Sequence, residues 1–264
     1  HIQVICEHLE AITAGKLRKL LINIPPRHSK STIVSVMYPM WEWIQHPEEK
    51  FLCASYSGVL SIRDNLKARR LVQSPWYQER WGHLFELAGD QNAKQKFEIE
   101  AGGSRHAVAA GSVTGARADH VIIDDPHSVE SANSDAMRAS TLEWFTEAVP
   151  TRLNNPKTSA IVIIMQRLHL DDLVGYAFAK GGWEVINLPA IAEEYTEHTF
   201  KTAWGERKVI RHPGTPLHGR LDAQGRILSK NWELYDGQHV VFQPNLMSVD
   251  ELTTGHQWAW KAVY

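Results

Sequence analysis

The sequence contains very little cysteine and no long apolar run. Its 264 residues include only two cysteines, Cys6 and Cys53, which stand far apart. A disulfide scaffold and a zinc site are therefore not indicated, and a reducing compartment fits this composition. No apolar stretch reaches the roughly eighteen residues that a membrane helix needs, so we expect no membrane span. No signal peptide is visible either.

The chain also lacks a large excess of charge of either sign, because its formal net charge is only -2. Such a chain does not attract nucleic acid over its whole surface, so any DNA contact must come from local basic patches. Hydrophobic residues make up 43% of the chain, which is ordinary for a globular protein. The length predicts one large domain, or one domain with an appendage.

Short apolar runs alternate with helical patterns over about the first 190 residues. Strands are predicted at 17–24, 51–56, 120–124, 160–165 and 184–188, and helices at 1–14, 30–45, 57–72 and 134–151. This alternation predicts a three-layer α/β domain with a parallel sheet. The most apolar strand, 160–165, is expected at its centre, buried on both faces. Residues 97–100 and 106–110 are expected to pair as a hairpin, and 78–94 to be irregular.

A candidate phosphate-binding loop follows the first predicted strand. It fits the pattern G-x-x-x-x-G-K-[ST] except that Ile24 and Ser29 replace the two glycines. The predicted phosphate-binding residues are Arg27, His28, Ser29, Lys30, Ser31 and Thr32. Lys30 would reach the β- and γ-phosphates of a nucleotide, and the Ser31 hydroxyl would bind Mg²⁺. The alternative is a solvated turn between a strand and a helix.

A second apolar strand ends in two carboxylates, Asp124 and Asp125, roughly ninety residues after Lys30. A hydrophobic strand that delivers an acid beside a phosphate loop is typical of ATPases that hold Mg²⁺. The next carboxylate is then placed to polarise a water molecule. The two motifs together are much more specific than either one alone.

A basic cluster is predicted on the helix 57–72. Its members are Arg63, Lys67, Arg69 and Arg70. Such a cluster is either a solvated helix face or a surface that contacts DNA phosphates.

Five motifs in this order resemble the large terminase subunit of tailed bacteriophages. They are Ile-Pro-Pro-Arg-His-Ser-Lys-Ser at 24–31, Ala-Ser-Tyr-Ser at 54–57, Thr-Gly-Ala-Arg-Ala-Asp at 114–119, Ile-Ile-Asp-Asp-Pro at 122–126, and Met-Gln-Arg-Leu-His-Leu-Asp-Asp-Leu at 165–173. The resemblance implies a P-loop NTPase of the ASCE type that hydrolyses ATP to move double-stranded viral DNA into a procapsid. Residues 1–192 would be the ATPase core. Residues 193–264 would be a small lid or linker subdomain before a nuclease domain that is absent from this sequence.

The resemblance also implies roles for single residues. Asp124 and Ser31 would hold Mg²⁺, and Asp125 would act as the base that activates water, with Glu130 as a second candidate. Gln166 would sense the γ-phosphate.

Arg117 lies in the loop before the strand that ends in Asp124. In a ring of subunits, the resemblance implies that Arg117 could act as an arginine finger on a neighbour's ATP. The alternative is a structural cation that pairs with Asp119.

The implied partners are double-stranded DNA, the phage portal protein and the small terminase subunit. The implied assembly is a homo-oligomeric ring, with a monomer as the alternative for an isolated domain. The implied location is the cytoplasm of the bacterial host, without a membrane.

Two other functions remain open at the level of sequence. A metal-dependent nuclease could use Asp124, Asp125, Asp171 and Asp172, because two-metal nucleases need clustered carboxylates. However, Asp171 and Asp172 open a predicted helix, where acids are common. The second alternative is a nucleotide-binding docking module that does not hydrolyse ATP.

Overall fold

The structure is a computed structural model. It describes residues 1–112, 115–189, 196–202, 205–211, 223–228, 242–243 and 248–254. The chain forms two compact units, the first made of His1–Ala190 with Glu197–Ile210 and the second of Ile191–Thr196 with Arg211–Tyr264. The predicted boundary at residue 192 stays a prediction, and much of the predicted lid or linker subdomain lies outside the described residues.

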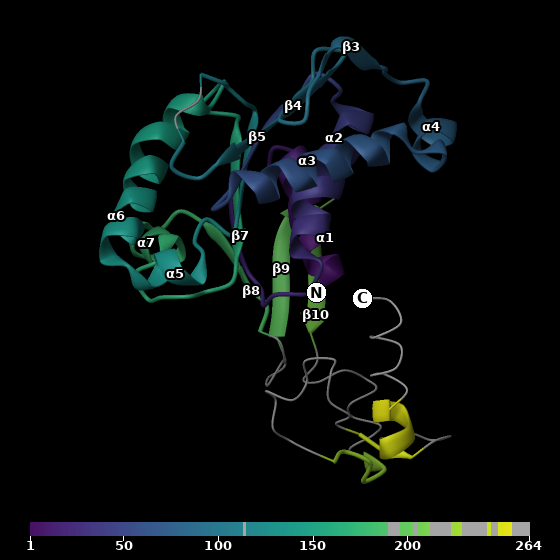
Figure 1. Cartoon of the computed structure of the whole chain (residues 1–264), viewed down its shortest axis with the longest axis vertical. Coiled ribbons are helices and arrows are strands. Elements are labelled where there is room, and N and C mark those ends of the chain that lie inside the picture. Colours follow the sequence, from purple (N-terminus) through teal and green to yellow (C-terminus); the bar gives the residue numbers. More distant parts are fainter. Residues whose placement is uncertain are drawn as a thin grey trace. The chain divides into compact units, whose positions relative to one another are not determined.

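A mixed sheet forms the framework of the first unit (Figure 1). Its strands are β1 (Lys19–Asn23), β2 (Lys50–Ser55), β3 (Leu87–Asn92), β4 (Lys96–Ile99), β5 (Ser104–Ala109), β6 (His120–Asp124), β7 (Ala160–Met165) and β8 (Glu184–Asn187). Their order in the sheet is β3-β4-β5-β2-β6-β7-β1-β8. The strands from β5 to β8 in this order are parallel, as predicted. The β4–β5 hairpin is confirmed, and β3 and β4 add an antiparallel edge.

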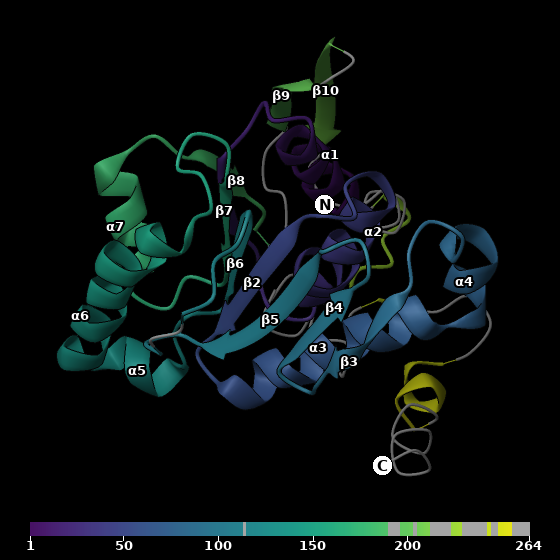
Figure 2. The same ribbon diagram turned by 90° about the horizontal axis from the view of Figure 1, so that it is seen from above.

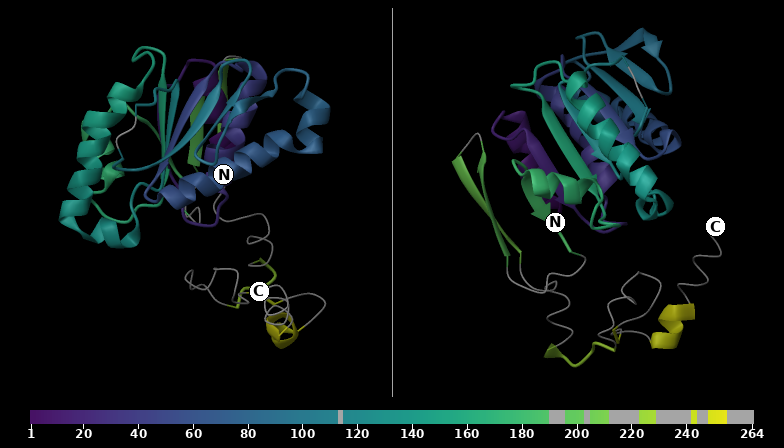
Figure 3. Two further views of the ribbon diagram at one scale, coloured as in Figure 1. Left: turned by 45° about the horizontal axis from the view of Figure 1, so that its top comes forward. Right: turned by 90° about the vertical axis from the view of Figure 1, so that its left-hand side faces the viewer.

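Helices cover both faces of the sheet. They are α1 (Ile2–Thr13), the π-helix η1 (Thr32–Met37), α2 (Tyr38–Gln45), α3 (Gly58–Gln73), α4 (Pro75–Trp81), α5 (Val129–Asn133), α6 (Asp135–Glu143), the π-helix η2 (Trp144–Ala148), the 3-10 helix η3 (Val149–Arg152) and α7 (Leu173–Lys180). Figures 1 and 2 show α1, α2 and α3 on one face and α5, α6 and α7 on the other. The views in Figure 3 show the same three layers, which confirms the predicted architecture. A separate two-stranded sheet is formed by β9 (Thr196–Thr202) and β10 (Gly205–Arg211).

The core consists of two apolar clusters, one on each side of the sheet. Alternate residues of β7 supply them: Val162 and Ile164 pack with α1, η1 and α3, whereas Ile161 and Ile163 pack with η2 and α7. Successive strand side chains point to opposite faces, so an all-apolar strand can serve both clusters. The prediction that 160–165 is central and buried on both faces is therefore confirmed.

Three local predictions need correction. Residues 78–94 are not irregular, because Pro75 and the cap from Ser74 start α4, and residues 87–92 pair with β4 as β3. The helix predicted at 134–151 changes after Glu143 into a π-helix and then a 3-10 helix, since Pro150 cannot donate a backbone hydrogen bond. The helix predicted from residue 30 likewise runs through the π-helix η1 before α2 begins.

Candidate active site

The strands β1, β2, β6 and β7 are parallel, so they end at one edge of the sheet. The segments that follow them line a cleft of about 400 Å³. Open α/β sheets bind ligands at this edge. The lining residues are Pro26, Arg27, Ser29, Lys30, Ser31, Thr32, Ser55, Tyr56, Leu60, Arg63, Asp64, Lys67, Asp124, Asp125, His127, Ser128, Val129 and Gln166.

The loop after β1 has the backbone shape of a loop that surrounds an anion. Arg27 and Ser29 have φ values of 65° and 60°, in the left-handed region that favours glycine. The amide of Ile33 donates to the Ser29 carbonyl oxygen at 3.0 Å, so the helix starts directly after Ser29. The first amides of a helix carry partial positive charge and attract anions. Ser29 therefore takes the conformation that the missing glycine would supply.

Lys30 is buried in this cleft and pairs with Asp125. Its Nζ lies 2.6 Å from Asp125 Oδ1, and its side chain is only 7% exposed. The same carboxylate oxygen accepts the backbone N–H of Gln166 at 3.2 Å. Asp125 has a φ of 44°, so this turn is also strained. The phosphate loop, the turn after β6 and the end of β7 thus meet at one oxygen atom.

Asp124 is buried behind this pair, and one of its oxygen atoms has no partner. Ser35 Oγ donates to Asp124 Oδ2 at 2.7 Å, whereas Oδ1 has no hydrogen-bond partner among the described residues. Burial, together with the charge of Asp125, raises the pKa of Asp124 to about 6, although Ser35 and Ser31 lower it. A buried carboxylate oxygen without a donor, next to a serine hydroxyl, fits the oxygen ligands that Mg²⁺ prefers.

A buried arginine on another strand of the sheet holds the serine that donates to Asp124. Arg105, on β5, is fully buried. It donates to the Ser35 carbonyl oxygen at 2.5 Å and to Asn65 Oδ1 on α3. Arg105 therefore holds the π-helix residue whose hydroxyl binds Asp124. The sequence contains no motif that marks this arginine, because its role depends on three separate elements.

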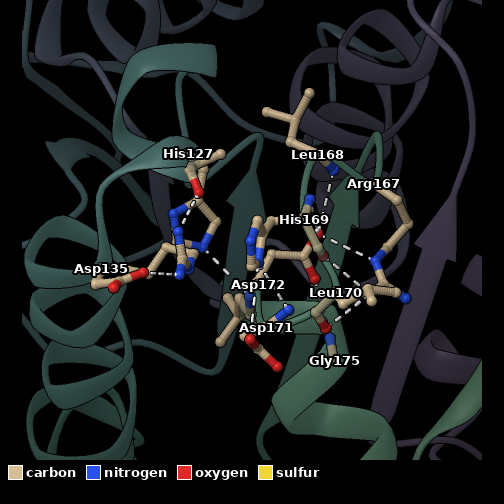
Figure 4. Close-up of polar contacts among 12 residues, drawn as sticks. His127, Asp135, Arg167, Leu168, His169, Leu170, Asp171, Asp172 and Gly175 are labelled. Atoms are coloured by element: carbon tan, nitrogen blue, oxygen red, sulfur yellow. Dashed lines mark hydrogen bonds and ion pairs between the residues drawn. The ribbon is translucent and has the colours of Figure 1, made fainter.

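The loop between β7 and α7 is organised by Asp172, which is fully buried (Figure 4). Its Oδ2 accepts Arg167 Nε at 3.0 Å and the Leu168 amide at 3.2 Å, and its Oδ1 caps α7 through the Gly175 amide at 3.0 Å. Asp172 therefore has a structural role, and the buried carboxylate does not join Asp124 and Asp125 in a metal cluster.

The same loop is tied to the turn after Asp125 through a histidine. The Leu173 amide donates to His127 Nε2 at 3.2 Å. Burial lowers the pKa of His127, so the ring is neutral near pH 7 and Nε2 can accept this bond. This contact and the bond from Gln166 to Asp125 connect α7 to the cleft.

Three predicted site residues lie outside the cleft lining. Glu130 is exposed in the first turn of α5. His28 is half-buried, and its Nδ1 lies 2.9 Å from the Pro26 carbonyl oxygen.

Arg117 lines a different hollow, together with Lys50 and Lys96, before the start of β6. A five-residue strand spans roughly 16 Å, so Arg117 is remote from Asp124 at the other end of β6. The alternative pairing with Asp119 is not among the ion pairs found within the described ranges, where Asp119 accepts hydrogen bonds from Lys50 N and Asn154 Nδ2.

Other lining residues were not predicted as site residues. On α3 they are Leu60, Arg63, Asp64 and Lys67. Their helical spacing, on the helix that follows β2, is a usable signal once β2 is known to neighbour β6.

The described residues contain neither a cluster of metal-binding side chains nor a membrane-spanning helix. Within the described ranges, no group of three or more His, Cys, Asp or Glu side chains gathers in a way that could hold a metal ion. None of the helices described is long and apolar enough to cross a bilayer.

The comparison with solved structures gives the class of fold. No protein-family model and no curated protein matches the chain. The ATPase domain of the Thermus phage P74-26 large terminase, as its R139A mutant, aligns with a TM-score of 0.50 and 14% identity, over 72% of this chain and 80% of that one. This likeness, together with the sheet order, shows that the chain shares the three-layer α/β fold of that domain. The resemblance stated from the sequence is thus confirmed at the level of the fold.

Two further solved structures are similar at lower scores. The HK97 bacteriophage large terminase aligns with a TM-score of 0.41 and 17% identity, over 64% of this chain and 34% of that one. The N-terminal domain of the DNA packaging ATPase from bacteriophage phi29 aligns with a TM-score of 0.42 and 14% identity, over 73% of this chain and 95% of that one. The chain thus spans about a third of the HK97 large terminase.

Proposed function

We propose that this cleft binds ATP with Mg²⁺ and hydrolyses it. One observation carries the proposal: the phosphate-loop lysine and two consecutive carboxylates, distant in sequence, line one cleft at the carboxyl edge of the sheet. A lysine that reaches phosphates, an acid that holds the metal and a further acid beside it are the parts that ATPases use.

Each of these residues has a specific role in this proposal. Lys30 exchanges Asp125 for the β- and γ-phosphates when the nucleotide binds. Asp125, released from Lys30, then polarises the attacking water, and the bond from the Gln166 amide keeps its carboxylate in place. Ser31 and Asp124 would hold Mg²⁺, which supplies positive charge to the phosphate oxygens when it is bound.

We further propose that hydrolysis moves double-stranded DNA into a phage procapsid, in the cytoplasm of the bacterial host. The fold shared with a large-terminase ATPase domain and the five sequence motifs support this proposal. Its partners would be the portal protein, the small terminase subunit and further copies of this chain in a ring. Arg117 would then act on the nucleotide of a neighbour, since it is remote from Asp124 in its own chain.

Steady-state ATP turnover with Mg²⁺ tests the ATPase proposal. We expect turnover by the wild type and its loss in Lys30→Ala, because Lys30 is the phosphate-loop lysine and pairs with the proposed base. Lys16→Ala is the matched control, since Lys16 lines a hollow that does not include the phosphate loop. Nucleotide binding without turnover by the wild type would instead favour a docking module, and equal turnover by the wild type and Lys30→Ala would contradict the proposed site.

A further inference from the structure

One face of α3 forms part of the wall of the nucleotide cleft. Leu60, Arg63, Asp64 and Lys67 all line it. They follow the spacing i, i+3, i+4, i+7, which places side chains on one side of a helix. This face belongs to the helix that follows β2, whereas the phosphate loop follows β1, so two separate parts of the chain line the cleft.

The carboxylate of this face fixes its two cations. Arg63 donates to both oxygens of Asp64, at 2.9 and 2.8 Å, and Lys67 Nζ lies 3.5 Å from Asp64 Oδ1. Asp64 is 8% exposed, whereas Arg63 and Lys67 are 48% and 51% exposed. A bidentate carboxylate restricts a guanidinium to one orientation. The cations are thus held in place while their outer groups stay accessible.

This face carries an excess of positive charge. Two cations share one carboxylate, and neither forms an ion pair with any other acid in the described part of the chain. The hydrogen bonds to Asp64 raise the pKa of the Arg63 guanidinium, and the charge of Asp124 raises it as well. Arg63 lines the same cleft as Asp124 and Asp125, the carboxylates on which the proposed reaction depends.

We propose that Arg63, oriented by Asp64 and assisted by Lys67, binds phosphate oxygens of the nucleotide and stabilises the charge that develops during hydrolysis. The inference rests on the proposed ATPase function. In that reaction, the water oxygen bonds to the γ-phosphorus while the bond to the bridging oxygen of ADP breaks. The water's proton passes to Asp125, and ADP and inorganic phosphate leave. Arg63 contacts the oxygens of the transferred group and forms no covalent bond.

An arginine within the chain and an arginine from a neighbour affect the rate differently as the protein concentration changes. If the chain supplies this cation itself, the factor by which Arg63→Ala lowers kcat is the same at every protein concentration. An arginine supplied by a second copy, as proposed for Arg117, makes the specific rate rise with concentration in the wild type and in Arg63→Ala alike.

The experiment compares the wild type with Arg63→Ala, Arg63→Lys and Arg70→Ala in the full chain. Arg70 is an exposed arginine two helical turns further along α3, and it does not line the cleft. The readouts are kcat over a range of protein concentrations and the Kd of a fluorescent ADP analogue. We expect Arg63→Ala to lower kcat by about 100-fold or more while the Kd for ADP changes by about 3-fold or less. Arg63→Lys keeps the ion pair with Asp64 and should recover part of kcat, and Arg70→Ala should match the wild type.

The remaining outcomes distinguish an error in the role of Arg63 from an error in the proposed ATPase function. A kcat for Arg63→Ala within about 2-fold of the wild type, when Lys30→Ala is inactive, overturns the inference and leaves the ATPase standing. Weaker binding of a fluorescent DNA duplex with unchanged kcat also overturns it, because the phosphates recognised would then be those of DNA. Equal turnover by the wild type and Lys30→Ala contradicts the proposed function itself. If Arg63→Ala does not fold, Arg63→Lys decides: partial kcat with an unchanged Kd supports the inference, and a wild-type kcat overturns it.

Discussion

Lys30 Nζ lies 2.6 Å from Asp125 Oδ1, in a cleft where the lysine side chain is only 7% exposed. The predicted phosphate ligand and the predicted base therefore neutralise each other in this structure. In the proposed function, a nucleotide phosphate would compete with Asp125 for the lysine, which would couple nucleotide binding to release of the base. We propose that this exchange links nucleotide binding to activation of the water.

Replacing Ser29 by glycine should stabilise the protein. Its φ of 60° is a conformation that costs a non-glycine residue about 1–2 kcal/mol, and part of this gain is offset by the greater freedom of glycine in the unfolded chain. We expect Ser29→Gly to raise the free energy of unfolding by about 0.5–1 kcal/mol in denaturant titrations. Ser57, with a φ of -124° and no capping hydrogen bond from its side chain, is the matched control. Ser57→Gly should lower the free energy of unfolding, and a similar loss in Ser29→Gly would refute the argument.

Asp124→Asn should stabilise the nucleotide-free protein while abolishing turnover. The folded pKa of Asp124 is about 6, above its ordinary value of 3.8, so the folded state resists ionisation. Stability is therefore lost as the pH rises from about 4 to about 6, and the loss above that window is on the order of 3 kcal/mol.

Urea unfolding of the wild type and Asp124→Asn at pH 5 and pH 7.5 checks this prediction. The variant should be the more stable protein, and its advantage should be larger at pH 7.5 by about 1 kcal/mol. An advantage that does not change with pH would mean that Asp124 ionises normally in the folded state.

The sequence was sufficient to predict the parallel sheet, the phosphate loop and the pair of carboxylates after the second apolar strand. The strand 160–165 was predictable because every residue in it is apolar, and such a strand belongs at the centre of a parallel sheet. Lys30, Asp124 and Asp125 were predictable as candidates because they lie at or after the carboxyl end of a strand, the edge where such sheets bind ligands. The loop survives without glycine because Ser29 takes the left-handed conformation itself.

Contacts between distant elements were not predictable in the same way. The basic residues of α3 were recognised, but Arg63 and Lys67 could be assigned to the cleft only after β2 was seen beside β6. Arg69 of the same cluster instead bonds to Asn92. Arg105 has no local signal at all, because it acts through Ser35 and Asn65 from two other elements.

Asp171 and Asp172 should differ sharply in their effect on stability. Asp172 is fully buried and accepts an arginine and three backbone amides, whereas the Asp171 side chain is 83% exposed. Asp172→Ala should lower the free energy of unfolding by about 3 kcal/mol, because a buried charge-assisted network loses its acceptor. Asp171→Ala should change it by less than about 0.5 kcal/mol. Denaturant titration of the two variants measures both values.

The same pair of variants tests the nuclease alternative. In a plasmid-cleavage assay with Mg²⁺ or Mn²⁺, we expect Asp171→Ala to cause no loss of cleavage relative to the wild type. Metal-dependent cleavage that requires Asp171 would contradict the structural role assigned to this loop.

The most direct test of the account is a single-turnover experiment on Asp125→Asn, with ATP binding measured in the same samples. Asparagine cannot take the proton of the attacking water, and it no longer holds Lys30 as an ion pair. We predict that the variant binds ATP as tightly as the wild type or more tightly, and hydrolyses it about 100-fold or more slowly. A variant that hydrolyses bound ATP at the wild-type rate would contradict the claim that the Lys30–Asp125 cleft is the site of hydrolysis.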